Sequence, residues 1–174
     1  MDPHTLASLR RGVEVALVAS VPQVLAPQVE ERLLALPAGS ASIDPRFIQR
    51  LGEMANRELP EDIRWLGASA FHFGYAAFWG ALYALAYERR PVHPILGGLL
   101  LSGLIYGITF TRWGGATQTR TEPPPERRDW RMKLLFLTPP VVFGLGTALL
   151  YGRGPRRGED VLAAEILRNH RDAA

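Results

Sequence analysis

Apolar residues gather in long runs that are separated by polar and charged segments. The two clearest runs carry no formal charge: 23 residues at positions 65–87 and 21 residues at positions 91–111. At about 1.5 Å per helical residue, each run is long enough to cross the roughly 30 Å hydrocarbon core of a bilayer. Only Glu88, Arg89 and Arg90 separate the two runs. The pattern therefore predicts two membrane helices joined by a tight, charged turn.

Two further apolar runs contain prolines and are expected to cross the membrane as irregular helices, because neighbouring helices can satisfy the carbonyl groups that proline leaves free. The sequence thus predicts an all-α, polytopic membrane protein whose single domain, residues 1–174, holds a four-helix transmembrane bundle. An alternative has three spans, with the first run lying in the membrane interface. The four expected spans are approximately residues 12–34, 65–87, 92–111 and 133–152.

The first connection contains a helical pattern of a different kind. Over residues 45–59, apolar side chains recur with a period of 3.6 residues opposite arginine and glutamate side chains. Asp44 is expected to cap the start of this amphipathic helix, and Pro60 to end it. The helix is expected to pack on the bundle or to dock a partner. A short polar helix is also predicted in the tail, at residues 159–170.

Small residues in the second and third runs predict close packing between helices, because they let two backbones approach each other. We therefore expect residues 65–111 to form the packing core. On this interpretation, Gly103→Leu should destabilise the fold more than Ala16→Leu. The expected packing residues are Gly74, Gly80, Gly98, Ser102, Gly103 and Gly107.

The charge distribution favours a membrane over a nucleic acid as the partner. The formal net charge is +3, but the basic residues flank apolar runs, where lipid headgroups would meet them. Those bordering the membrane favour a bacterial inner-membrane location with both termini in the cytoplasm. The chain contains no cysteine, which excludes disulfides and thiolate chemistry. The expected headgroup-binding residues are Arg10, Arg11, Arg89, Arg90, Arg127, Arg128, Arg131, Arg153, Arg156 and Arg157.

His72 is the most informative polar residue, because an ionisable side chain inside a membrane helix is costly and often functional. It is expected either to form an interhelical hydrogen bond or to respond to protons. Its partner is expected from residues 23–31 or from the chain beyond Arg112. Tyr75 is expected to line a polar path beside it.

Two carboxylates belong to the predicted membrane region. Glu14 is expected to lie near the turn that contains Glu88, and to form an ion pair there with Arg89 or Arg90. No spacing of His, Asp and Glu side chains predicts a metal site. No phosphate-binding loop or nucleophile motif is present, so neither a cofactor nor an enzymatic activity is predicted.

The stretch HFGYAAFWGALYALAYE, followed by GGLLLSGLIYG, resembles the YagU-like bacterial inner-membrane proteins. The resemblance implies four spans, an extended loop after the first span, and a link to acid resistance without a known reaction. The chain departs from that pattern after its first span, where Pro27 and the Glu-Glu-Arg run stand in place of Pro-Pro-Arg, and at Tyr106. The matching residues are His72, Gly74, Gly80, Tyr83, Glu88, Gly98 and Gly103.

These observations favour a non-enzymatic accessory, structural or stress-related membrane protein, with the bilayer and a membrane-protein partner or a second copy as its contacts. One alternative is a small transporter or proton-responsive channel in which His72, Tyr75 and the proline breaks line a path. Another is a membrane subunit of a larger electron-transfer or light-harvesting assembly.

Overall fold

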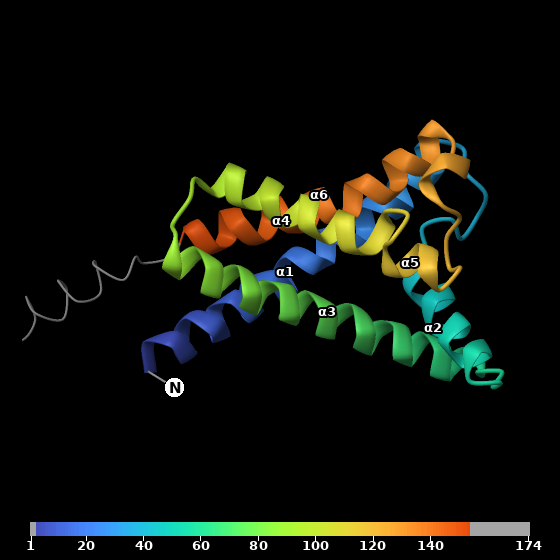
Figure 1. Ribbon diagram of the computed structural model, residues 1–174, viewed down its shortest axis with the longest axis horizontal. Helices are drawn as coiled ribbons and strands as arrows, with labels where there is room; N and C mark the ends of the chain where they lie inside the picture. Colours follow the sequence, from blue (N-terminus) through green and yellow to red (C-terminus); the bar gives the residue numbers. More distant parts are fainter. Residues whose placement is uncertain (1–2, 154–174) are drawn as a thin grey trace, which may run out of the picture.

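The computed structural model describes residues 3–153, and every regular element within them is a helix. Four long helices extend along the molecule (Figure 1), and α2 and α5 cluster at one end. We call this end, with the connections at residues 34–60 and 111–129, the loop end; the opposite end, with the α3–α4 connection at residues 90–93, is the turn end. Arg156, Arg157 and the tail helix predicted at residues 159–170 lie outside the described residues. The elements are α1 (Pro3–Leu33), α2 (Ile43–Met54), α3 (Glu61–Arg89), α4 (Pro94–Phe110), α5 (Gly115–Gln118), the 3-10 helix η1 (Pro125–Arg127) and α6 (Trp130–Gly152).

Among the described residues, three helical stretches are long and apolar enough to cross a membrane: α1, Pro94–Gln118 and α6. They indicate a membrane protein. The 29 residues of α3 are not in this group, because its glycines, tyrosines and His72 lower its mean hydropathy. The expected all-helical fold is thus confirmed, while hydropathy supports three membrane-crossing helices instead of the expected four.

The main helix pairs are α1 with α3, α1 with α6, and α4 with α6. Although α3 and α4 follow each other in the chain, they are not among the closely packed pairs. The prediction that residues 65–111 form the packing core is therefore wrong. The long α1 lies between α3 and α6, and α6 in turn provides the surface for α4.

Glycines permit the two closest helix crossings. A β-carbon at Gly80 of α3 would collide with the carbonyl oxygen of Gly12 in α1. At the α4–α6 crossing, a β-carbon at Gly98 would lie 2.9 Å from the Cα of Leu145, and one at Gly144 would collide with the Oγ of Ser102. Gly80, Gly98 and Ser102 therefore lie at close helix contacts, as such small residues allow.

The other three expected packing residues have no such role within this chain. A β-carbon at Gly74, Gly103 or Gly107 would meet nothing within 4 Å, so the prediction for these three positions is wrong. Each residue of an α-helix is rotated by about 100° from the last. Ser102 therefore faces α6, whereas Gly103 faces away from it, a difference that the run of small residues does not reveal.

The amphipathic helix in the first connection is shorter than predicted. Its N-cap is Ser42, whose side chain makes no capping hydrogen bond, so the prediction that Asp44 caps the helix is wrong. The helix ends at Met54, five residues earlier than expected. Asn56 has a φ of 54°, a left-handed conformation that asparagine tolerates and that stops the helix.

Candidate functional site

An open cavity of about 410 Å³ lies in the loop-end half of the bundle, with walls from α1, α2, α3, α4, α5 and α6. We call it the apolar cavity, because most of its lining residues are aliphatic, aromatic or proline. Pro27 of α1 and the Pro139-Pro140 pair of α6 contribute to its wall. Its volume is in the range of small-molecule sites, which combine apolar walls with a few polar groups.

His72 links two helices at the wall of the apolar cavity. Its Nδ1 lies 2.9 Å from Oδ2 of Asp44, the second residue of α2. The His72 side chain is only 13% exposed, whereas that of Asp44 is 35% exposed. The expectation that the partner would come from residues 23–31 or from beyond Arg112 is therefore wrong. Asp44 looked like a helix cap in the sequence, and that interpretation concealed its contact with α3.

The geometry of this pair assigns the ring hydrogens. A carboxylate can only accept a hydrogen bond, so Nδ1 of His72 carries the hydrogen that is donated to Asp44. Nε2 is buried and has no hydrogen-bond partner among the described residues. It follows that the proton gained at low pH is added to Nε2, and that the gain turns a hydrogen bond into an ion pair.

Tyr75 forms the second polar contact of the cavity wall. Its hydroxyl group lies 2.8 Å from Oγ1 of Thr109 and connects α3 to the end of α4. The Tyr75 ring stacks on Phe71, with 5.6 Å between ring centroids, and Phe71 in turn contacts Phe47 of α2 at 4.8 Å. Aromatic contacts and the His72–Asp44 pair therefore hold α2 against the same face of α3.

Glu14 and Glu88 lie away from the apolar cavity. Glu14 forms an exposed ion pair with Arg10, with 2.7 Å between Oε1 and Nε, so the predicted ion pair with Arg89 or Arg90 is wrong. The reason is that α1 begins at Pro3 and brings Arg10 one turn before Glu14 on the same helix.

Glu88 belongs to a cluster at the turn end. It accepts a hydrogen bond of 2.9 Å from the hydroxyl group of Tyr151 in α6. The guanidinium group of Arg11 lies 4.7 Å from the centroid of the Tyr151 ring and donates to the Tyr151 carbonyl oxygen. Arg11, expected to bind headgroups, therefore fastens α1 to the end of α6.

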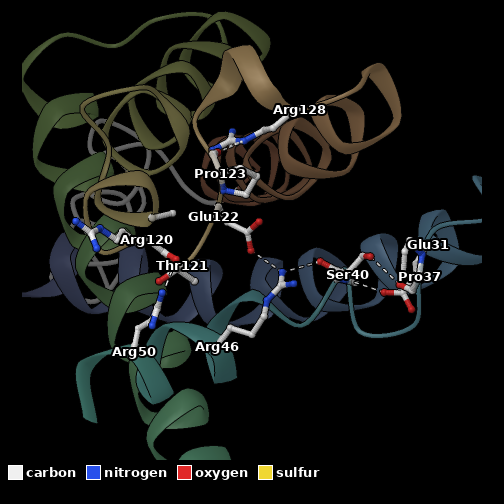
Figure 2. Close-up of polar contacts among 12 residues, drawn as sticks. Glu31, Pro37, Ser40, Arg46, Arg50, Arg120, Thr121, Glu122, Pro123 and Arg128 are labelled. Carbon is white, nitrogen blue, oxygen red and sulfur yellow. Dashed lines mark hydrogen bonds and ion pairs between the residues drawn. The ribbon is translucent and has the colours of Figure 1, made fainter. Parts of the chain in front are cut away.

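Arg128 is buried, which contradicts its expected role in headgroup binding. It is 4% exposed, and it donates hydrogen bonds to the carbonyl oxygens of Pro123 at 2.7 Å and Phe110 at 2.9 Å. Figure 2 shows Arg128 directed toward Pro123 within the loop end. Its neighbours in the sequence are exposed, so nothing in the pattern of charges distinguished it. The other described arginines of that set that are exposed are Arg10, Arg89, Arg90, Arg127, Arg131 and Arg153.

Glu122 is a buried carboxylate that the sequence did not single out. It is 4% exposed, and its Oε1 lies 2.5 Å from Nη2 of Arg46 in α2. Figure 2 shows Arg46 between Glu122 and Ser40, whose carbonyl oxygen also accepts from Arg46 at 2.9 Å. Burial raises the pKa of Glu122, and this effect outweighs the lowering by Arg46 and Arg128. The ion pair ties α2 to the α5–α6 connection.

The described residues contain no group of three or more His, Asp or Glu side chains that could hold a metal ion. None of the family models, curated proteins and solved structures compared with this chain matches it. The resemblance to the YagU-like proteins stays a prediction, and the argument about function rests on the geometry of the chain itself.

Proposed function

We propose that the chain is a multi-pass protein of the bacterial inner membrane in which α3 is a fourth span and both termini are cytoplasmic. The 29 residues of α3 correspond to about 43 Å of helix at 1.5 Å per residue, which exceeds the hydrocarbon thickness of a bilayer. Exposed Arg89, Arg90 and Arg153 gather at the turn end, where they favour a cytoplasmic location. The loop end then faces the outside.

In this membrane protein, the proposed role of the apolar cavity is a non-enzymatic, stress-related one that responds to protons. The observation that carries the proposal is the 2.9 Å contact between His72 and Asp44 at the cavity wall. A histidine side chain changes charge between about pH 5 and pH 8. In acid, the His72–Asp44 ion pair holds α2 against α3; at higher pH the contact weakens, and α2 moves away to open the cavity.

The surroundings of His72 make Asp44 its dominant charged neighbour. The titratable residues that line the cavity are Asp44 from α2, together with His72 and Tyr75 from α3. From α1 the polar lining residues are the uncharged Gln23 and Gln28, and from α4 it is Thr109. The charge state of the pair therefore depends on two groups that belong to different helices.

Thiol labelling tests this role, because the chain has no cysteine of its own. Ile48 of α2 packs against Gly67 of α3, so Ile48→Cys reports on whether α2 is docked. Its labelling rate should be divided by that of Met54→Cys, which is 69% exposed on the same helix, to remove the effect of pH on thiol reactivity. We expect this ratio to rise about threefold from pH 5.5 to pH 8, as for a partly exposed ion pair.

The matched control adds His72→Gln, which keeps a hydrogen-bond donor for Asp44 but does not titrate. In this background the ratio should stay constant with pH. A rise of the same size with glutamine at position 72 would show that another group controls α2, and would end the proposal.

A second candidate function, a small transporter or proton-responsive channel, is favoured by the lining of the cavity. His72, Tyr75 and the prolines of α1 and α6 meet there, as a polar path would require. Toward the turn end, buried Trp79, Tyr83 and Phe143 fill the bundle. Proton flux into liposomes under an imposed pH gradient tests conduction; flux equal to that of protein-free liposomes would exclude it.

A further inference from the structure

A second hollow lies beside the apolar cavity at the loop end. This groove of about 600 Å³ lies between the α1–α2 connection, α2 and the start of α3. Figure 2 shows part of its wall, with Arg46 and Arg50 on one side and Ser40 and Thr121 around them. In contrast to the apolar cavity, its lining is rich in charged side chains. We call it the polar groove.

The polar groove and the apolar cavity adjoin each other. Ser42, Pro45 and Trp65 line both of them, so only these residues separate a charged compartment from an apolar one. Trp65 is 49% exposed, and tryptophan is enriched where headgroups meet hydrocarbon. The apolar compartment reaches into the helical bundle, whereas the polar one lies among the connections. The arrangement has the polarity of a lipid molecule that stands with its headgroup at the loop end.

The charges of the polar groove are balanced. Arg46 is already paired with buried Glu122. The remaining charged lining residues form two neighbouring pairs, Arg50 with Glu53 and Arg64 with Glu61, the latter at 3.9 Å. An anionic headgroup therefore gains no net attraction, whereas a zwitterionic one can offer its phosphate to the guanidinium groups and its ammonium to the carboxylates.

We propose that the polar groove and the apolar cavity form one binding site for a single phospholipid whose headgroup carries a phosphate and a primary ammonium, with an acyl chain in the apolar cavity. Arg50 and Arg64 bind the phosphate, and Glu53 and Glu61 accept hydrogen bonds from the ammonium. This inference rests on the proposed membrane location of the chain, but not on the response of His72 to protons.

The test uses the full chain, purified and stripped of lipid in detergent. It is mixed with equal amounts of phosphatidylethanolamine, phosphatidylglycerol and phosphatidylcholine that carry identical acyl chains, and bound lipid is identified by native mass spectrometry. We expect one lipid per chain, with phosphatidylethanolamine enriched about fivefold over each of the other two, the difference expected when one headgroup satisfies more charged hydrogen bonds. Preference for phosphatidylglycerol, equal retention of all three, or no retention would each overturn the proposal.

Two pairs of variants separate the compartments. The double substitution Arg50→Gln and Arg64→Gln should lower retention about tenfold, whereas Arg57→Gln, exposed outside the groove, should not. Ser69→Trp introduces a large ring into the lining of the apolar cavity and should also lower retention, whereas Ala70→Trp, exposed and outside the lining, should leave it unchanged. An unchanged circular dichroism spectrum confirms that each variant is folded; normal retention by both the double variant and Ser69→Trp would refute the site.

Two further measurements complete the test. Soluble phosphoethanolamine at millimolar concentration should not displace the lipid; displacement would show that the groove binds a headgroup without the cavity, and would overturn the bridging site. His72→Gln should retain phosphatidylethanolamine as the wild type does. Failure of the pH-dependent labelling together with intact lipid retention would therefore reject the proton response alone, whereas loss of lipid selectivity with intact labelling would reject the lipid site alone.

Discussion

The turn-end half and the loop-end half of the bundle differ in how they fill their interiors. In the turn-end half, glycines let α1 meet α3 and α4 meet α6 at backbone distance, and large aromatic side chains such as Trp79 and Phe143 fill the remaining space. In the loop-end half, prolines and polar residues surround the apolar cavity. The difference suggests that the turn-end half supplies stability and leaves the loop-end half free to bind and move.

Buried polar groups show the same contrast. At the turn end, Glu88 and Arg11 use their contacts to fix the last turn of α6 through Tyr151. At the loop end, Asp44 and Arg46 of α2 contact His72 and Glu122, which belong to other elements. The position of α2 thus depends on ionisable groups, whereas the long helices depend mainly on shape.

Substitutions at the tight crossing should have the largest effect. Ala16 is fully buried, and a β-carbon at Gly80 would collide with it. We expect Ala16→Leu to lower the free energy of unfolding by about 3 kcal/mol through overpacking. Gly103→Leu should change it by less than about 1 kcal/mol, and in the stabilising direction, because leucine is the better helix former and the site is open. Unfolding in mixed detergent micelles measures both.

This order reverses the expectation from the sequence, in which Gly103 was the more sensitive position. A larger loss from Gly103→Leu would mean that Gly103 packs against a second copy or another protein, and the contrast between the two halves would then need that partner.

Removal of the buried guanidinium group should have the next largest effect. Arg128→Gln deprives the carbonyl oxygens of Phe110 and Pro123 of their donor and leaves them buried. We expect a loss of about 2 kcal/mol in the free energy of unfolding, typical of unsatisfied buried polar groups. Arg127→Gln, at the exposed neighbouring residue, is the control and should have almost no effect. Similar losses from the two would contradict the structural role of Arg128.

The smallest effect should appear as a dependence on pH. Because burial raises the pKa of Glu122 above its usual 4.5, the folded state binds a proton more tightly than the unfolded state. The contribution of Glu122 to stability is therefore largest below pH 4.5 and falls as pH rises through the folded-state pKa. The free energy of unfolding of the wild type minus that of Glu122→Gln should decrease over this range.

The control for this pH dependence is Glu126→Gln, at an exposed carboxylate in the same connection. Its difference from the wild type should stay flat. A difference for Glu122→Gln that increases with pH would mean that attraction by Arg46 and Arg128 outweighs burial.

The sequence predicted the helices better than their partners. Uncharged runs and prolines located the long helices, because helix length and apolar content are local properties. The pairing of α3 with α1, and of α4 with α6, depends on which face each glycine occupies, and one residue separates buried Ser102 from open Gly103. A membrane helix that is apolar on every side gives no periodic signal to choose between those faces.

The candidate site was only partly predictable for a related reason. His72 and Tyr75 stood out because polar residues are rare in apolar runs. Asp44, Glu122 and Arg128 lie in polar connections where charges are common, so their burial depends on contacts between residues far apart in the sequence. Asp44 lies 28 residues from His72, and local patterns carry no record of such a contact.

The pairing of the helices also bears on the order in which a ribosome delivers them to the membrane. Once α3 has been inserted, it can join α1 immediately, because both are present. For α4 the main partner is α6, which is synthesised about twenty residues later and must also pack against α1. A nascent chain that ends before α6 therefore holds a paired α1 and α3 beside an α4 that lacks its main contact surface. Assembly of the bundle is completed by its last described helix.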